Sequence, residues 1–279
     1  MKTTYSTSNT TDGTTATARM ATAGKAIIIG MALLICPFAH AQDERNDALV
    51  QSERNGWEFE VKTGVNIGGA SPIPLPVEVR SIDSYSPRFN GSLEGMVTKW
   101  LDKSPHWGVS VALKVEEKGM ITGAKVKNYS MEIIDDGSRV AGRWTGYVKT
   151  KYNTTMLTIP VMANYRFNNT WKVRGGLFAS LRLDGEFTGH VSDGYLRETD
   201  PTGEKLAFTD GKTAAYDFSS NLNHFQWGAQ VGGTWRAFRH FTVNADLAWA
   251  FTDIFEKDFK TITFNMYPIF LNVGFGYTF

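Results

Sequence analysis

The chain has 279 residues, of which 42% are apolar and 20% are charged, a composition typical of a folded chain rather than a disordered one. Glycine is abundant, at 27 residues, and proline is scarce, at 9, which favours strands and turns over helices. The near balance of 29 basic and 28 acidic residues gives no electrostatic basis for binding nucleic acid.

The N-terminal part predicts a targeting segment. Residues 26–35 form a short apolar run that follows Lys25 and precedes the sequence Ala39-His40-Ala41. A basic start, a short apolar centre and an A-x-A end are the features of a secretory signal peptide, and the run is shorter than the roughly 20 residues of a membrane-spanning helix. We predict a cleaved signal peptide over residues 1–41. Its first 19 residues are rich in Thr and Ser, so we expect translation to begin at Met20.

Cleavage of this leader would change what chemistry is open to the chain. The single cysteine, Cys36, lies inside it, and its loss excludes disulfides, cysteine–zinc sites and cysteine nucleophiles. The exported chain keeps 26 basic and 27 acidic residues, because the leader removes Lys2, Arg19, Lys25 and Asp12. We expect residues 42–56 to form a short periplasmic segment and residues 57–279 to form one domain.

From Trp57 onward, apolar residues repeatedly occupy every second position, as in a strand with one apolar face. At the start, Trp57, Phe59 and Val61 alternate with Glu58 and Glu60. Each such segment approaches or exceeds the roughly 9–11 residues of a tilted membrane strand. The predicted strands are 57–68, 88–101, 107–116, 155–167, 171–183, 225–235, 241–251 and 267–279.

The connections between these strands alternate between long and short. The long ones are 69–87, 121–150, 185–221 and 253–265, and the short ones are 102–106, 168–170 and 236–240. Long external loops and short periplasmic turns are expected of an outer-membrane barrel, whereas a soluble sandwich or a lipocalin-like barrel has no reason to separate them.

Aromatic residues gather at the strand ends that flank the short connections, as they do in the interfacial girdle of a membrane barrel. The residues of this predicted ring are Trp57, Trp107, Phe167, Trp171, Trp235, Phe241, Tyr277 and Phe279. Backbone groups in lipid must be paired, so a strand protein can span a membrane only as a closed barrel. We therefore predict an all-β fold: a single closed antiparallel up-and-down transmembrane β-barrel of about eight strands over residues 57–279.

Three segments resemble one bacterial family. Leu157-Thr158-Ile159-Pro160-Val161 resembles the "Y-L-x-I-P" strand of PorT-like outer-membrane barrels of Bacteroidetes-type bacteria, and Lys114–Gly119 resembles their "Y-x-x-K-G" strand end, without its usual aromatic. Phe275-Gly276-Tyr277-Thr278-Phe279 resembles the C-terminal signal that the barrel assembly machinery reads. The resemblance covers most of residues 57–279 and implies the outer membrane as location. One type within the family serves type IX protein secretion, but no functional residue can be carried over.

The face opposite the apolar one carries charges of both signs. We expect six acids there, Glu58, Glu60, Glu94, Glu116, Asp184 and Asp246, and seven bases, Lys62, Lys114, Arg166, Lys172, Arg174, Arg182 and Arg236. These charges could line an ion path. Because buried charges are normally paired, we favour a salt-bridged plug that holds a narrow barrel together.

The connections hold few candidates for chemistry. His190 and His224 lie in or beside the longest one, near Ser192, Ser219 and Ser220, and a Ser-His pair there would resemble a lipid A deacylase. Long polar loops contain such residues by chance, so we predict no catalytic, cofactor-binding or metal site. Trp144 and Tyr147 are expected to extend a strand above the membrane and to form an outer aromatic belt.

Three functions from different classes remain open. The first, which we favour, is a non-enzymatic structural, binding or secretion-assembly component of the cell envelope that acts through external loops, since function often resides in loops on a rigid scaffold. The second is a narrow porin-like channel or a hydrophobic-solute transporter, and the third is a lipid A-modifying hydrolase. The expected partners are outer-membrane lipids, the barrel assembly machinery through Phe279, and an envelope or secretion protein.

Overall fold

The computed structural model describes residues 56–135 and 137–279. The predicted signal peptide and residues 42–55 of the predicted periplasmic segment lie outside the described residues. Within the described ranges, no helix is long and apolar enough to cross a membrane.

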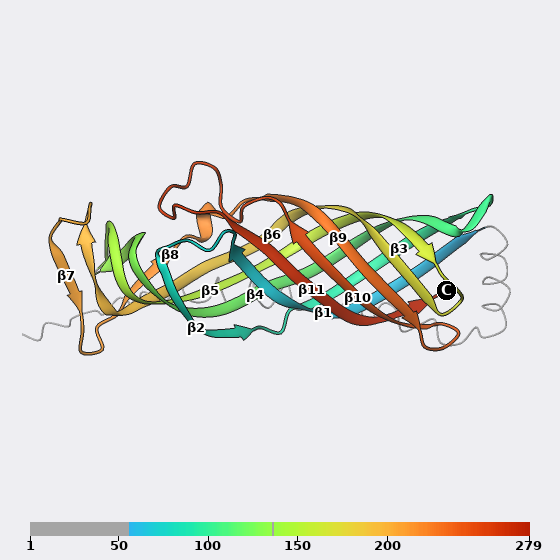
Figure 1. Ribbon diagram of the computed structural model, residues 1–279, viewed down its shortest axis with the longest axis horizontal. Helices are drawn as coiled ribbons and strands as arrows, with labels where there is room; N and C mark the ends of the chain where they lie inside the picture. The colour runs from blue at the N-terminus through green and yellow to red at the C-terminus, as the bar shows by residue number, and fades with distance from the viewer. Residues whose placement is uncertain (1–55, 136) are drawn as a thin grey trace, which may run out of the picture. The chain divides into compact units, whose positions relative to one another are not determined.

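Eight long strands form the wall of the molecule (Figure 1). They are β1 (Trp57–Pro72), β3 (Gly91–Leu101), β4 (Ser104–Asp135), β5 (Ser138–Arg166), β6 (Trp171–Glu198), β9 (Phe225–Arg236), β10 (Phe241–Ala250) and β11 (Met266–Thr278). Shorter elements lie in the connections: β2 (Val79–Pro87), β7 (Lys205–Phe208), β8 (Ala214–Asp217) and the 3-10 turn η2 (Ser219–Asn221).

The pairing of these eight strands closes into a ring. Every neighbouring pair is antiparallel, in the order β3, β1, β11, β10, β9, β6, β5, β4. Strand β4 pairs with β5 on one side and with β3 on the other, which joins the two ends of the sheet. The predicted all-β barrel of eight antiparallel strands is confirmed, and each predicted strand overlaps one strand of the wall.

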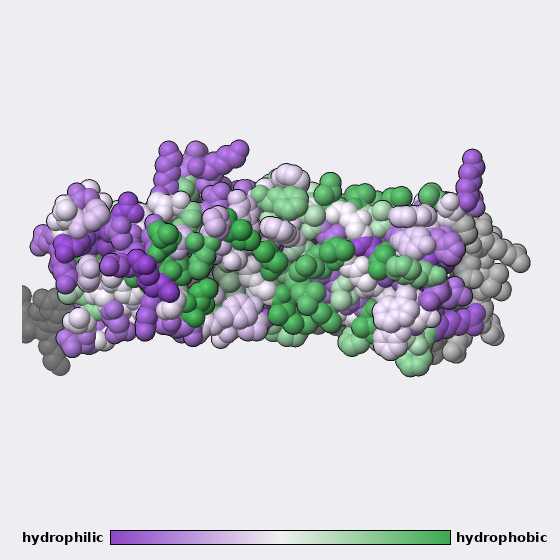
Figure 2. Space-filling model, viewed as in Figure 1, coloured by the Kyte–Doolittle hydropathy of each residue, from purple (hydrophilic) through white to green (hydrophobic). Residues whose placement is uncertain are grey.

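The faces of the wall are arranged as in a membrane barrel. Phe59 is 46% exposed, while the next residue, Glu60, is 2% exposed. The same contrast holds around the ring, where Leu113 and Val231 point outward and Lys114 and Gln230 point inward. Figure 2 shows apolar side chains spread over the barrel strands and hydrophilic ones gathered toward the end that holds β7. Because the exterior is apolar and the interior polar, the wall is suited to hydrocarbon outside it.

The predicted aromatic ring lies at the end of the barrel that has the short turns. The strand pairing places Trp171 opposite Trp235 and Phe241 opposite Tyr277, and the two indole rings stack with centroids 6.2 Å apart. Trp57 starts β1 here, Trp107 lies three residues into β4, and both stay exposed. This girdle marks the level where the apolar exterior meets water at the end with the short turns, which the sequence pattern assigned to the periplasm.

The long connections differ from the sequence prediction. Residues 121–150 were expected to form a loop, but β4 and β5 continue through them as paired strands up to the pair Asp135–Ser138. Strand β6 likewise extends to Glu198, and β7 and β8 pair with it. The strands continue because side chains beyond the membrane-spanning part still alternate between the two faces and still have a neighbouring strand to pair with. Only 253–265, of the four long connections, holds no strand of its own.

These extensions pack around a second core, and we call residues 126–148, 187–222 and 251–265 the platform. Met131, Ile133, Trp144, Leu196 and Phe208 are almost completely buried in it. Trp144 meets Phe208 edge to face, with centroids 5.5 Å apart. The expectation that Trp144 belongs to an outer aromatic belt is therefore wrong, because its side chain points into the platform core.

The connection 251–265 folds over this core. Ile254 and Phe255 are buried, and Leu222 forms an isolated bridge with Phe255. The amide of Asn223 donates to the carbonyl of Ile254 at 2.7 Å, and that of Glu256 donates to the carbonyl of Asn221 at 2.9 Å. These bonds join the two connections that leave β6 and β10.

Candidate functional site

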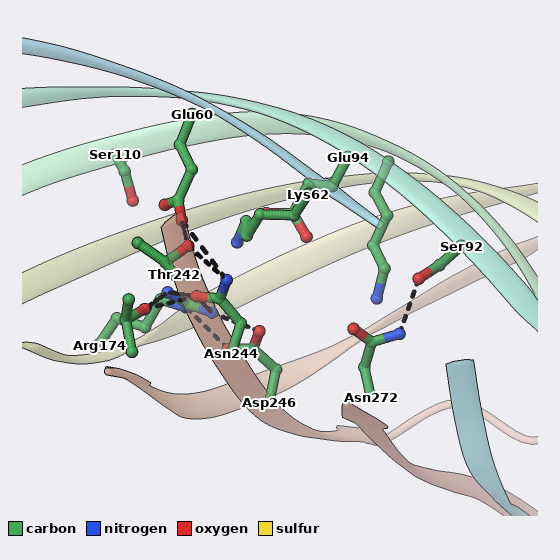
Figure 3. A network of polar contacts seen from close by, with 12 residues as sticks. Glu60, Lys62, Ser92, Glu94, Ser110, Arg174, Thr242, Asn244, Asp246 and Asn272 are labelled. Carbon is green, nitrogen blue, oxygen red and sulfur yellow. Dashed lines mark hydrogen bonds and ion pairs between the residues drawn. The ribbon is translucent and has the colours of Figure 1, made fainter. Parts of the chain in front are cut away.

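The barrel interior is filled by a network of charged and polar side chains (Figure 3). At its centre Arg174 of β6 reaches past β9 to Asp246 of β10, and its Nε donates to Asp246 Oδ1 at 2.7 Å. Its Nη1 donates to Asn244 Oδ1 at 3.3 Å, and Thr234 also accepts from that nitrogen. The guanidinium is thus paired with a carboxylate and bonded to two further oxygens, as a buried cation requires.

Strand β1 supplies a second part of this network. Glu60 accepts hydrogen bonds from Thr242 and Asn244 of β10, and Lys62 pairs with Glu94 of β3 at 2.6 Å. Residues 58, 60, 62 and 66 share one face of β1 because side chains of a strand alternate. The four inward side chains therefore form a polar ladder that spans the lumen from the periplasmic girdle upward.

A third cluster lies higher on β4. One carboxylate oxygen of Glu116 lies 2.8 Å from Lys114 Nζ, and the other lies 2.7 Å from Lys118 Nζ. Thr158 donates to Glu116 Oε1 at 2.8 Å. All four side chains are buried. One carboxylate thus bridges two ammonium groups, which leaves one positive charge in excess. The Lys118 ammonium also faces an aromatic ring, with its Nζ 5.5 Å from the centroid of Phe178.

The last cluster closes the periplasmic end. Glu58 pairs with Lys172 on one oxygen, while its other oxygen lies 3.5 Å from Arg236 Nη2 and accepts from Trp100 Nε1 at 3.3 Å. Arg166 lies beside this cluster, with its guanidinium 4.5 Å from the centroid of Trp100.

Most of the predicted lumen charges lie where the alternation placed them, with two exceptions and one omission. Asp184 is exposed, because a register shift in the β5–β6 pairing at Thr155–Met156 turns the strand over. Arg182 is half-buried at the upper rim, where its Nη2 donates to the carbonyl of Leu222 at 2.8 Å. Lys118 was missed, since the predicted strand ended at residue 116.

This arrangement places pairs of opposite charge along the lumen. Each of the buried acids just described is paired with a base or accepts hydrogen bonds from hydroxyl and amide groups. Eight strands enclose an interior only wide enough for side chains, and here those side chains meet across it. The geometry matches the salt-bridged plug that the sequence favoured over an ion path.

The serine and histidine candidates are spread over separate contacts. His224 lies 3.3 Å from Arg182 Nη2, and Ser219 Oγ accepts from the amide of Phe187 at 3.0 Å. Ser192 donates to Asp193, and His190 lies beside Lys149 on a surface depression. In the part of the chain that the structure describes, no group of three His, Cys, Asp or Glu side chains is placed to hold a metal ion.

Above the polar lumen lies an apolar cavity of about 400 Å³ that sequence reasoning did not predict. Its inner surface is formed by Met120, Ala124 and Val126 of β4, Val148 of β5, Phe187 of β6 and Met266 of β11. Its outer rim is formed by the end of β1, from Gly68 to Pro72, and by Ile82 and Tyr85 of β2. The volume falls within the range of small-molecule sites, about 300–1,000 Å³.

Comparisons with solved structures give distant matches. The attachment invasion locus protein Ail of Yersinia pestis, solved in complex with the heparin analogue sucrose octasulfate, is 12% identical over 80% of this chain and 99% of its own, with a TM-score of 0.35. Neisserial surface protein A is 11% identical over 80% and 97%, with a TM-score of 0.30. OprG of Pseudomonas aeruginosa is 12% identical over 81% and 97%, with a TM-score of 0.29.

No curated protein sequence matches this chain. A sequence profile of the outer membrane protein beta-barrel domain matches residues 41–256, which is well over half of the chain. That match agrees with the closed ring of antiparallel strands, the apolar exterior and the paired polar lumen, and the chain therefore belongs to the family of the outer membrane protein beta-barrel domain.

Proposed function

We propose that this chain is a non-enzymatic outer-membrane barrel of the PorT-like type, and that it binds an envelope or secretion partner through its platform. The observation that carries the proposal is the contrast between the two ends of the molecule. The barrel encloses a lumen filled by paired charges, while the platform has its own packed core and presents a hydrophilic outer surface (Figure 2). A rigid scaffold of this kind supports recognition better than conduction.

The proposal includes a route to the membrane. Export would use a cleaved signal peptide, residues 1–41, and insertion would use the barrel assembly machinery, which would read the C-terminal Phe279. The PorT-like assignment rests on the resemblance of residues 157–161 and 114–119. The lipid A hydrolase alternative requires His190 or His224 as base, and loss of a lipid A acyl product in His190→Ala or His224→Ala would favour it.

Conductance tests whether the lumen is closed. Purified protein is inserted into a planar bilayer, and limited proteolysis of the platform verifies the insertion. We expect no steady conductance, because the pair Glu58–Lys172 joins the opposite strands β1 and β6 across the lumen, and Arg174–Asp246 and Lys62–Glu94 hold further charges in place along its wall. Steady, large conductance would establish the channel alternative and refute a plugged scaffold.

Crosslinking in cells tests whether the platform binds. A photo-reactive amino acid is placed at Lys205, on β7, and in a control at Arg239, an exposed residue in a short turn at the opposite end. We expect a discrete protein adduct from the platform position that the control position does not give. If photo-reactive residues at Lys205, Thr209 and Lys212 all give no adduct, binding through this face is refuted.

A further inference from the structure

The barrel wall is incomplete on one side, next to the apolar cavity. Strand β1 pairs with β3 only from Trp57 to Val65, while on its other side it pairs with β11 up to Pro72. Strand β2 pairs with β4 along one edge, and within the described ranges its other edge has no strand partner. In Figure 1 the end of β1 and strand β2 stand apart. Residues 67–72 and β2 therefore bound a gap between two strands that each have one free edge.

Few bonds cross this gap. The Tyr85 hydroxyl donates to the carbonyl of Gly68 at 2.8 Å, and the amide of Asn66 donates to the carbonyl of Asn90 at 2.8 Å at the lower end. Unpaired backbone is not tolerated against lipid hydrocarbon, because its polar groups have no partner there. The free edges of β1 and β2 are therefore expected at an interfacial level, where water reaches them.

The gap lies at the level of the outer membrane interface. Gly69 is opposite Ile269 of β11, and Ile269 is opposite Trp249 of β10. Trp249 lies with Trp227 and Phe251 in an exposed aromatic group, where Trp227 and Phe251 meet edge to face with centroids 5.4 Å apart. Such groups mark the boundary between hydrocarbon and water, so the mouth of the cavity faces the outer leaflet of the membrane.

The rim and the walls of the cavity are suited to hydrocarbon. Leu75 and Ile82 line it and are also 56% and 60% exposed, so the apolar surface continues from the cavity to the outside. Large exposed apolar patches mark sites of interaction with ligands or membranes. An apolar cavity is a poor place for water, which needs two to four polar partners, and a lipid or alkyl chain needs none.

The floor of the cavity is polar and closed. Met120 lines the cavity, and the next inward residues of β4 below it are Lys118 and Glu116, which form a buried ion pair. Asn66 donates to the carbonyl of Glu117 at 2.8 Å at the same level. A ligand that enters from the membrane would therefore stop above this pair and would not continue into the lumen.

From these observations we propose that the gap between β1 and β2 admits one alkyl chain of an amphiphile from the outer leaflet, which the cavity binds while the polar head group stays at the rim. This site is independent of the partner proposed for the platform, since it faces the membrane rather than the platform's outer surface. The structure assigns binding here and not passage, because the floor is closed.

Photo-crosslinking tests the site with two probes. The protein is reconstituted in nanodiscs that contain a phospholipid with a diazirine near the end of one acyl chain, or a free fatty acid with the same diazirine. Crosslinks are mapped by mass spectrometry. We expect crosslinks on the inward residues Met120, Ala124 and Val126 from at least one probe. The free acid alone would identify a diffusible amphiphile, and the phospholipid would identify a bilayer lipid. Crosslinks confined to outward residues such as Val111 and Leu113, with both probes, would overturn the proposal.

A matched pair of variants separates binding from general contact with lipid. Ala124→Phe places a ring inside the cavity, whereas Ala163→Phe makes the same change on the outward face of β5. If the ring displaces about four methylenes, affinity should fall by about two hundredfold, and crosslinks to Met120 and Val126 should disappear. Crosslinks to Leu113 should persist in both variants, and Ala163→Phe should keep those in the cavity.

A second variant, Thr122→Phe, covers the case in which Ala124→Phe fails to assemble. Each variant is scored only after the folded barrel has been verified by its shifted mobility on gels without heating. Unchanged cavity crosslinks in a folded Ala124→Phe or Thr122→Phe barrel would refute the site.

Discussion

Arg174 and Asp246 form a two-point contact over the inner face of strand β9, which separates the two strands that carry them. Both side chains are almost fully buried, at 3% exposure each. Removing one partner would leave the other charge uncompensated in the interior, and such changes typically cost about 3–5 kcal/mol. We therefore expect Asp246→Ala to lower the free energy of unfolding in urea by this amount in lipid vesicles. The double variant Arg174→Met with Asp246→Leu should recover most of the loss. Similar stability of Asp246→Ala and the parent would contradict the contact.

The Glu116 cluster predicts an order among single substitutions. Glu116→Gln would leave the ammonium groups of Lys114 and Lys118 without their shared carboxylate, whereas Lys114→Met would leave Glu116 paired with Lys118. We expect Glu116→Gln to reduce the free energy of unfolding more than Lys114→Met, by at least about 1 kcal/mol, since a buried group without a partner bears its full desolvation penalty. Urea unfolding of both variants under identical conditions measures the order, and the reverse order would count against the bridging role of Glu116.

The platform core predicts local unfolding that does not affect the barrel. Trp144 is completely buried against Phe208, so Trp144→Ala should cost about 3–5 kcal/mol of platform stability. Limited proteolysis should then cut residues 126–148 or 187–222, while the barrel keeps its folded mobility on unheated gels. Trp227→Ala, which removes an indole from the outward face of β9, serves as the control and should leave the platform resistant. Equal protease resistance of the two variants would argue against a separate platform core.

The sequence predicted the barrel well because the membrane imposes a two-residue period. The contrast between Phe59 and Glu60 can be read directly from the chain, and so can the aromatic girdle from Trp57 to Phe279. Asp184 could not be placed, because one extra residue at the Thr155–Met156 shift inverts the pattern beyond it. Trp144 was expected to extend a strand above the membrane, and it does, but its side chain was misplaced because the sequence does not show that the extensions of β4 and β5 enclose a second core. The apolar cavity depends on where β1 and β2 separate, and strand pairing of that kind leaves no local pattern.

Asp253 predicts a pH dependence in the connection between β10 and β11. Its Oδ1 accepts from the amide of Met266 at 3.0 Å and from that of Phe255 at 3.3 Å. Burial raises the pKa of this carboxyl above its usual value, and the backbone amides that bond it offset only part of that effect. A raised pKa means that folding favours the protonated form, so the contribution to stability is fully present below the unfolded pKa and is lost as pH rises through the folded pKa. Amide hydrogen exchange at Met266, corrected for intrinsic rates, should show more protection at acidic than at neutral pH.

Two variants separate the charge of Asp253 from its hydrogen bonds. Asp253→Asn keeps an acceptor and should abolish the pH dependence while retaining protection, and Asp253→Ala should lose about 1–2 kcal/mol of local protection. A pH dependence that persists in Asp253→Asn would assign the effect to another group.

Phe279 allows assembly to be distinguished from stability. Its amide donates to the carbonyl of Phe59 at 2.9 Å, which fixes the end of the chain against β1, and its ring meets that of Tyr277 edge to face at 5.0 Å. A half-buried terminal ring with one aromatic neighbour contributes modestly to the folded barrel, and the backbone bond does not need the side chain. If the ring is also the signal for the assembly machinery, Phe279→Ala should reduce the amount of folded protein in cells several-fold. The free energy of unfolding of the refolded protein in urea should change by no more than about 1 kcal/mol.

The matched variant Phe238→Ala removes an exposed ring from a short turn at the same end and should leave the cellular yield unchanged. Parallel losses of yield and of stability in Phe279→Ala would show that the ring acts through the fold alone, and the proposed recognition would then be wrong.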